Sequence, residues 1–269
     1  MKKSVLTLVV LYCSLTAVIA QNYKKVFYKT QTIENADVKV TISDAVATAS
    51  GIKFRVTVVN KTTDYIFFKP SECTFKIAGK ESKPEEKVLI IRPKEDDFRI
   101  VDLKGSQYMV ASNYEFILDG IYKVSFIGKD GITAPDFKLP PARNDFKVGG
   151  FNVSLAKSGK ETAKTDAKFK INYTGDKIGV FEVNKVGMKM PDGKEFANYL
   201  EKKPVFYEKG DVDDFIVAWK DIPKASGDMQ KVDMLIIWRD AFKEITPEKI
   251  APQYLTILFD EETSNAKGK

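Results

Sequence analysis

Short runs in which apolar and polar residues alternate recur along most of the chain, and they constrain its fold more than any other feature. In Ile52–Val58 every second residue is apolar, a pattern that buries one face of an extended strand and exposes the other. Comparable runs, separated by Gly, Pro, Asn and Asp, are Val38–Ile42, Ile52–Val59, Cys73–Ile77, Val88–Ile91, Phe98–Val101 and Ile121–Ile127. Many short strands between turn residues predict an all-β chain of antiparallel β-sandwiches.

Four short sequence matches link the two halves of the chain in the same order, about 115 residues apart, which is within the usual size of one domain. They are Lys53–Val56 with Lys168–Ile171, Gly79–Glu81 with Gly193–Glu195, Asp96–Phe98 with Asp213–Phe215, and Ile132–Thr133 with Ile245–Thr246. The matches predict two tandem, duplicated domains, at residues 35–142 and 143–260, after an N-terminal segment at residues 21–34. Pro140 and Pro141 stiffen the expected join near Ala142.

The first twenty residues have the pattern of a secretory signal: Lys2 and Lys3, an apolar run and a small-residue site ending at Ala20. Cleavage there leaves Gln21 first and predicts export to the periplasm, the cell surface or the medium. A lipid anchor on Cys13 is an alternative, against which the bulky Tyr12 weighs. No later segment is apolar enough to span a membrane, so we expect no membrane insertion after cleavage.

The C-terminal end carries three further predictions. Thr246, Pro247 and Glu248 have the order of a helix start and predict one helical turn. Tyr254–Phe259 is expected to be the last strand of the second domain. Residues 261–269 lack apolar anchors and are expected to form a flexible tail.

Several chemistries are excluded by what the sequence lacks. There is no histidine among the 269 residues, which excludes nucleophile systems and zinc sites that need an imidazole. There is no glycine-rich phosphate loop, so no nucleotide cofactor is expected. The formal net charge of +6 comes from lysines spread along the chain, so no nucleic-acid partner is expected either. Cys73, the only cysteine after cleavage, alternates with Phe75 and Ile77 and is expected to be buried.

Two acidic pairs, Asp96 with Asp97 and Asp213 with Asp214, stand at equivalent places in the two halves. Carboxylate oxygens suit calcium, which makes these four residues candidate metal ligands. The alternative is a turn at the start of a strand, whose acids face water. No other cofactor is expected.

Trp219 and Trp238 occur only in the second half and are candidate ligand-binding residues, because aromatic faces can stack on sugar rings. The alternative is that they belong to the core, since both end apolar strands. A carbohydrate-binding protein is therefore one functional alternative. A hydrolase with a pair of carboxylates is a more distant alternative.

The two halves share a longer pattern: an amphipathic strand, a Phe-initiated strand ending at Asn60 or Tyr173, a Gly-Lys-Glu step, and acids before Phe98 or Phe215. This pattern resembles the immunoglobulin-like domains of unknown function in exported bacterial proteins, a group related to a small secreted immunoprotective antigen. The chain departs from antibody domains in lacking their Cys…Trp…Cys framework. The resemblance implies a non-enzymatic binding, adhesion or scaffold protein with a protein or glycan partner, and it carries over no catalytic residue.

Overall fold

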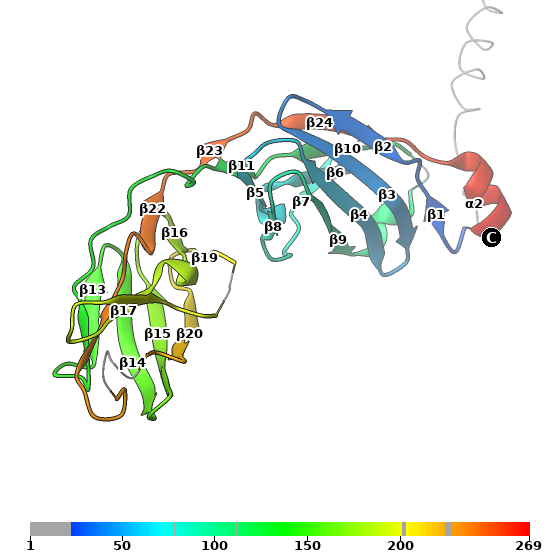
Figure 1. Cartoon of the computed structure of the whole chain (residues 1–269). Helices are drawn as coiled ribbons and strands as arrows, with labels where there is room; N and C mark the ends of the chain where they lie inside the picture. Colours follow the sequence, from blue (N-terminus) through cyan, green and yellow to red (C-terminus); the bar gives the residue numbers. More distant parts are fainter. Residues whose placement is uncertain (1–22, 78, 111, 201–202, 224–227) are drawn as a thin grey trace, which may run out of the picture. The chain divides into compact units, whose positions relative to one another are not determined.

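The structure is a computed structural model that describes residues 23–269 except 78, 111, 201–202 and 224–227. The expected signal at residues 1–20 and the alternative anchor Cys13 lie outside the described residues. The described chain is all-β with one short α-helix and divides into two compact units. Unit 1 comprises the residues up to Tyr122 together with Lys249–Lys269, and unit 2 comprises Lys123–Glu248. Both ends of the described chain, blue and red in Figure 1, belong to unit 1.

Unit 1 is built from antiparallel sheets. One sheet has the order β1-β3-β4-β9 with β2 also paired to β3, the second is β24-β10-β6-β7, and the third is β23-β11-β5-β8. The elements are β1 (Val26–Phe27), β2 (Gln31–Glu34), β3 (Val38–Thr48), β4 (Gly51–Asn60), β5 (Tyr65–Phe68), η1 (Pro70–Glu72), β6 (Thr74–Ile77), β7 (Lys80–Ser82), β8 (Leu89–Ile91), β9 (Asp96–Lys104), η2 (Ser106–Met109), β10 (Tyr114–Leu118), β11 (Ile121–Val124), β23 (Glu248–Lys249), β24 (Gln253–Ile257) and α2 (Glu261–Lys267). Strands β11 and β23 cross the two boundaries between the units.

Unit 2 has sheets in the orders β13-β14-β15-β20, β12-β21-β17-β18 and β19-β16-β22. Its elements are β12 (Phe137–Leu139), β13 (Asp145–Val148), β14 (Phe151–Lys160), β15 (Lys164–Tyr173), β16 (Ile178–Phe181), η3 (Val183–Lys185), β17 (Gly187–Lys189), β18 (Glu195–Ala197), β19 (Val205–Tyr207), β20 (Val212–Lys220), β21 (Met234–Ile237) and β22 (Phe242–Ile245). The order of pairing parallels that of unit 1, with β13 in the place of β2, β14 in that of β3 and β12 in that of β24.

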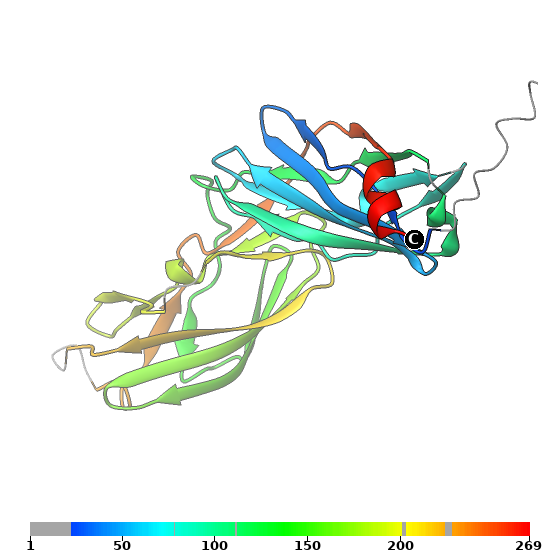
Figure 2. The same ribbon diagram turned by 90° about the vertical axis from the view of Figure 1, so that its right-hand side faces the viewer.

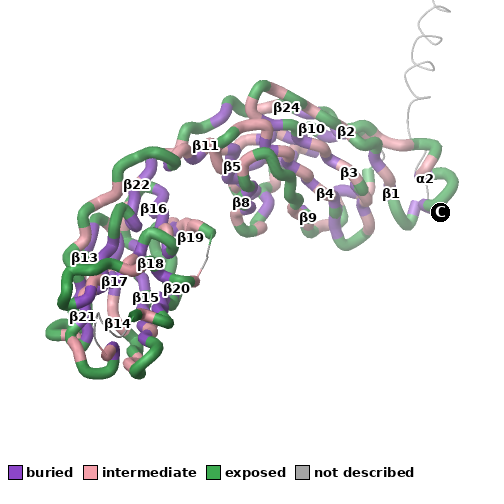
Figure 3. The backbone as a smooth tube through the Cα atoms, in the orientation of Figure 1, coloured by how far each residue is buried: buried purple, intermediate pink, exposed green. Residues whose placement is uncertain are grey.

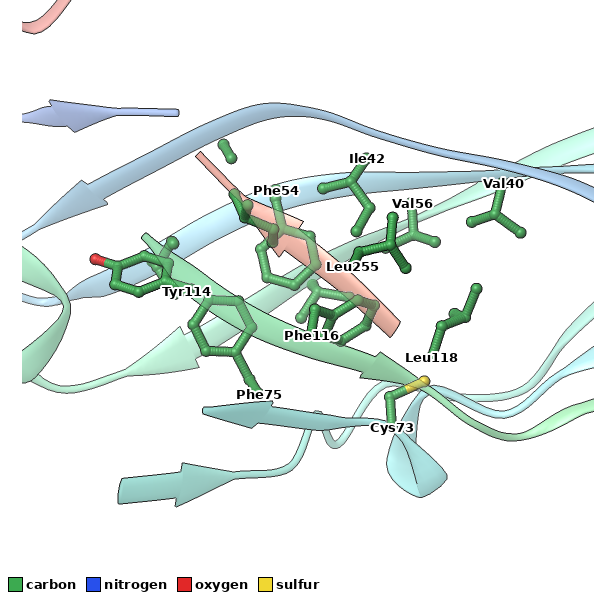
Figure 4. Close-up of a cluster of buried hydrophobic side chains, with 14 of the residues drawn as sticks. Val40, Ile42, Phe54, Val56, Cys73, Phe75, Tyr114, Phe116, Leu118 and Leu255 are labelled. Carbon is green, nitrogen blue, oxygen red and sulfur yellow. The ribbon is translucent and has the colours of Figure 1, made fainter. Parts of the chain in front are cut away.

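The core of unit 1 follows the alternation of its strands. Along β4, Ile52, Phe54, Val56 and Val58 are at most 1 % exposed, while the residues between them are more accessible. Figure 3 shows the same change between buried and exposed segments along β3 and β4. In Figure 4, Phe54 and the other labelled rings fill the space between two layers of strands. The alternating runs therefore predicted these strands correctly, because each strand buries one face.

Unit 2 has a second core, in which aromatic rings of several strands meet. Phe169 stacks on Phe215 with ring centroids 5.3 Å apart, and Phe181 lies 4.4 Å from Phe215. Pro191, Asp192 and Gly193 have the residue types of a tight turn and form the hairpin between β17 and β18: Gly193 has a φ of +84°, and its amide donates to the carbonyl of Met190. The sandwich-like all-β class predicted from the sequence is thus confirmed for the described residues.

The C-terminal residues differ most from the sequence-based expectations. The strand expected at Tyr254–Phe259 is β24, but it pairs with β10 of unit 1 and places Leu255 and Ile257 in the core of that unit. Residues 261–267 form α2 instead of a tail, because Asp260 caps the helix and Ser264 is buried against β1. Figure 2 shows α2, in red, beside the first strands of unit 1.

The division of the chain also differs from the boundary expected at Ala142. Residues 123–142 belong to unit 2, because β12 pairs with β21 over Phe137–Leu139. The helical turn expected at Thr246–Glu248 is corrected as well. Glu248 belongs to strand β23, and the amide of Ile250 donates to the carbonyl of Ile121.

Candidate functional site

The two tryptophans lie in the core of unit 2, which corrects their candidacy as a sugar-stacking platform. Trp219 is 1 % exposed and Trp238 is 3 % exposed. The Nε1–H of Trp219 donates to the carbonyl of Phe196, whereas the Nε1–H of Trp238 has no acceptor among the described residues. Trp238 borders a shallow hollow of about 280 Å³ together with Arg239 and Glu195, but neither ring presents a face on which a sugar could stack.

The acidic pairs stand at the starts of β9 and β20, where all four side chains are exposed. Asp97 and Asp213 each accept a hydrogen bond from the next backbone amide, and Asp214 forms an ion pair of 2.8 Å with Lys168. Neighbouring residues of a strand point to opposite faces, so the members of each pair diverge. Within the described part of the chain, no group of three acidic, histidine or cysteine side chains is placed to hold a metal ion. The proposed calcium ligands are therefore not brought together.

Cys73 is fully buried, and its thiol donates to the carbonyl of Asp119 at 2.9 Å. Burial raises the pKa of the thiol to about 12, since the thiolate would lose its hydration. The side chain is thus a core residue rather than a nucleophile.

A groove around the edge strand β13 is the strongest candidate site in the described structure. β12 and β13 are consecutive strands at the borders of two different sheets, joined by residues 140–144. One hollow of about 460 Å³ is bordered by both strands and by the connection between them. A second hollow of about 520 Å³ lies over the outer face of β13, β14 and β15 and shares Arg143, Asp145, Phe146 and Lys147 with the first. We call the two hollows together the β13 groove. Each falls in the size range of about 300–1,000 Å³ that is common for ligand pockets.

Aromatic side chains form the inner wall of the first hollow. Phe137 on β12 is 5 % exposed, and its ring lies 6.0 Å from that of the half-buried Phe146 on β13. Phe146 in turn packs against Trp238 at 5.1 Å. These rings fix the positions of the two edge strands and leave a partly accessible apolar surface on Phe146.

The rim of the β13 groove is basic. Its cations are Lys138, Arg143, Lys147 and Lys170, against the two carboxylates Asp136 and Asp145. Lys138 is neutralised by Asp233 at 2.7 Å. Arg143 and Lys147 are exposed, and no ion pair joins either of them to another described residue. The groove therefore carries cations that are available to an anionic ligand.

β13 also has a free backbone edge, because β14 is its only partner among the described strands. The amide of Leu155 donates to the carbonyl of Asn144, which marks residues 144 and 155 as a hydrogen-bonded pair. In an antiparallel ladder such pairs alternate with pairs whose backbone groups point away from each other. The pairs Asp145–Ser154 and Lys147–Asn152 are of the second kind. The amides and carbonyls of Asp145 and Lys147 therefore point outward, to the free side of the strand.

The equivalent sheet border in unit 1 differs from β13 in its charge and in being contacted by a strand of the facing sheet. Lys147 on β13 pairs with Asn152, and Glu34 on β2 pairs with Lys39. Asn152 and Lys39 are each the second residue of their strands, β14 and β3, so Lys147 and Glu34 occupy equivalent positions. Glu34 is neutralised by Lys61 at 2.7 Å, and β2 contacts β24 across the gap between the sheets. The same sheet border thus carries a neutralised acid in unit 1 and an unpaired base in unit 2.

Arg143, Phe146 and Lys147 were not predicted from the sequence. The signal that could have found them is a difference in charge between the two halves, because Lys147 and Glu34 precede equivalent strands and have opposite charges. Recognising that the two positions are equivalent requires the pairing register of the strands, and none of the four sequence matches includes these residues.

Comparison with protein-family models gave no match, and comparison with curated proteins gave none either. No helix among the described residues is long and apolar enough to cross a membrane.

Proposed function

We propose that the chain is an exported, non-enzymatic binding protein made of two immunoglobulin-like β-sandwiches related by duplication, and that it holds an acidic segment of a partner protein in the β13 groove. The common order of pairing in the two units supports the duplication. The signal-like N-terminus supports export. The resemblance of both halves to exported bacterial domains supports the immunoglobulin-like assignment.

The unpaired charge of Arg143 and Lys147 carries the proposal. A sheet border of this kind does not require a cation, since the equivalent position in unit 1 is Glu34 with its own partner Lys61. Exposed cations without partners attract anions and speed their association. A partner with several carboxylates therefore fits this rim.

A protein partner is favoured over a glycan by the burial of the aromatic residues. The carbohydrate-binding alternative relied on Trp219 and Trp238, and both are buried. The β13 groove offers an outward-facing backbone edge, which an extended peptide can match with its own regular series of N–H and C=O groups, whereas a sugar has no such series. The hydrolase alternative has no observation in its favour among the described residues.

The proposal can be tested with the protein that starts at Gln21 and a labelled, disordered peptide rich in Glu and Asp, followed by fluorescence anisotropy. We expect binding that weakens as salt rises, because the contacts are exposed ion pairs. Replacing both Arg143→Glu and Lys147→Glu should weaken binding about tenfold, since each exposed charge contributes on the order of 0.2–1 kcal/mol and is reversed.

Lys157→Glu is the matched control, because Lys157 is exposed on β14 of the same sheet but does not line either hollow. It should bind like the unchanged protein. Equal binding by the double variant would place the site elsewhere. Binding of polygalacturonate but of no acidic peptide would assign a glycan partner instead.

A further inference from the structure

The β13 groove has two properties that a purely electrostatic site does not need. One is the free edge of β13, whose outward backbone groups belong to Asp145 and Lys147. The other is the hollow between β12 and β13, bordered by Phe137 and Phe146 on its inner side. Both lie on the side of β13 that faces away from β14.

We infer that the acidic partner segment binds as an added β-strand along β13, with apolar side chains directed into the hollow beside Phe146 and acidic side chains directed outward beside Lys147. This inference rests on the proposed function and specifies the form of its ligand. The partner is an extended segment in which acidic and apolar residues alternate.

The alternation follows from the geometry of β13 itself. Along this strand Phe146 and Val148 face the core, while Asp145 and Lys147 face outward. A strand added beside β13 continues the same pleat, so its residues also alternate between the two faces. Its inward residues meet the aromatic wall. Its outward residues lie beside Asp145 and Lys147, so an acidic side chain is favoured beside Lys147 and, from the connection, beside Arg143, but not beside Asp145.

The free edge of β13 orients the added segment and also contributes to its affinity. Backbone hydrogen bonds along an exposed edge hold an extended peptide, and the alternate pockets select its side chains. Four residues of β13 are available, and two of them present their backbone groups outward. On two longer border strands part of the edge is already used by side chains: the amide of Asp102 on β9 donates to Glu86, and the amide of Ala218 on β20 donates to Asn198. The accessible edge and the unpaired cations thus coincide on β13.

Charge also discourages a second copy of the chain as the occupant. The protein has a net charge of +6, and because Asp145 and Lys147 of β13 have opposite charges, the excess positive charge at this edge comes from Arg143 in the connection. Pairing two β13 strands would bring together two copies of a positively charged protein, with Arg143 of each copy close to the shared edge, whereas an acidic strand complements this charge.

The test uses three labelled peptides of seven residues with the protein that starts at Gln21. The first alternates Glu and Val, the second has the same composition with the Glu residues grouped together, and the third is the alternating peptide with every backbone amide methylated. We expect the alternating peptide to bind at least about tenfold more tightly than the other two, because they lose backbone hydrogen bonds or the inward apolar contacts.

Two half-methylated peptides give a sharper readout. Methylation of the amides along one edge of the alternating peptide should abolish its binding, and methylation along the opposite edge should leave it unchanged. The two peptides should differ in affinity because an added strand forms hydrogen bonds with β13 along only one of its two edges. Equal affinities for both would overturn strand addition.

Failure of this inference is distinguishable from failure of the proposed function. If the grouped and methylated peptides bind as tightly as the alternating one, and the double variant Arg143→Glu, Lys147→Glu weakens all of them, the groove binds acids without strand addition. If no acidic peptide binds the unchanged protein, both proposals fall.

Discussion

The backbone amide of Phe27 donates a hydrogen bond of 2.9 Å to the side-chain oxygen of Ser264, 237 residues later in the chain. Ser264 is fully buried, and nearby the carbonyl of Gly268 accepts a bond of 3.1 Å from the amide of Lys25. The amide of Lys29 likewise donates to the carbonyl of Leu258. The first strand of unit 1 is therefore held by the last residues of the chain.

Removal of residues 253–269 should unfold unit 1 and leave unit 2 folded. The deletion takes Leu255 and Ile257 from the core and exposes the edge of β10. Full burial of each such side chain contributes about 1.5–3 kcal/mol, which is a large part of the stability of a single domain. Both tryptophans belong to unit 2, so their emission should keep its blue shift while the circular dichroism of the strands decreases.

A chain that ends at residue 260 is the milder control, since it retains β24 and loses only α2. It should keep both units folded and lower the melting temperature of unit 1. If the chain ending at residue 252 melted like the full protein, the C-terminal strand would have no role in closing unit 1.

The hydrogen bonds of Asp260 lead us to expect that the contribution of α2 to the stability of the folded protein depends on pH. Its carboxylate accepts a hydrogen bond from the amide of Thr263 at 3.0 Å and one from the Thr263 hydroxyl at 2.8 Å. The bond from the backbone amide, followed by that from the hydroxyl, lowers the pKa of Asp260 below its ordinary value. The folded state therefore binds this proton more weakly than the unfolded state does. The stabilisation is complete above the unfolded pKa of about 3.9 and disappears as pH falls through the lower folded value.

Asp260→Ala should accordingly lower the free energy of unfolding by about 1 kcal/mol at pH 7, the usual cost of losing an N-cap. Asp260→Asn keeps a capping oxygen and should cost less. Urea denaturation of the three proteins, followed by circular dichroism from neutral pH to pH 3, measures this. The difference between Ala and the unchanged protein should shrink at acidic pH, and a constant difference would contradict the role of the charge.

The sequence predicted features that depend on neighbouring residues. Ile52–Val58 alternates because one face of the strand is buried, and the Pro-Asp-Gly turn before Lys194 needs only its own backbone preferences. The strand near Tyr254 was expected for the same local reason. Its partner was not, because nothing in the run Gln253–Ile257 specifies pairing with β10, whose residue Ile117 faces Tyr254 across the ladder.

Polar anchoring explains why the last helix was missed. Residues 261–269 have no large apolar side chain, and sequence patterns detect buried faces through such residues. Ser264 and the Gly268 carbonyl attach the helix through hydrogen bonds to residues 24–27, which no local pattern reveals. The β13 groove was missed for a related reason: the importance of Lys147 depends on its ladder position and on its having no ion pair with another described residue, and both are properties of the folded sheet.

Cys73 should react with thiol reagents only after unfolding. Its side chain is fully buried, and burial raises the pKa of the thiol to about 12, so almost no thiolate is present at pH 8. In the protein that starts at Gln21, whose only cysteine is Cys73, titration with a maleimide or an aromatic disulfide in native buffer should label less than one thiol over a time in which the denatured protein is labelled completely. Rapid labelling under native conditions would show that the core between β6 and β10 opens readily.

Replacement by Phe should lower the free energy of unfolding by different amounts at the two tryptophans. Both side chains are nearly inaccessible, but the Nε1–H of Trp219 donates to the Phe196 carbonyl at 3.2 Å, while that of Trp238 has no acceptor among the described residues. Replacement by Phe removes a similar volume from the same core in each case. At Trp219 it also leaves the Phe196 carbonyl without this donor, whereas at Trp238 it removes a buried donor that had no partner.

Trp219→Phe should therefore cost about 1 kcal/mol more free energy of unfolding than Trp238→Phe, the typical net value of one hydrogen bond. Each variant keeps one tryptophan, so urea denaturation can be followed by fluorescence in both proteins and checked by circular dichroism. Trp238→Ala serves as the control for burial and should cost about 3–5 kcal/mol, because it empties the space between Phe146 and Phe169. Equal losses of stability in the two Phe variants would indicate that the Nε1–H of Trp238 is also hydrogen-bonded in solution. The predicted difference between the two tryptophans would then be wrong.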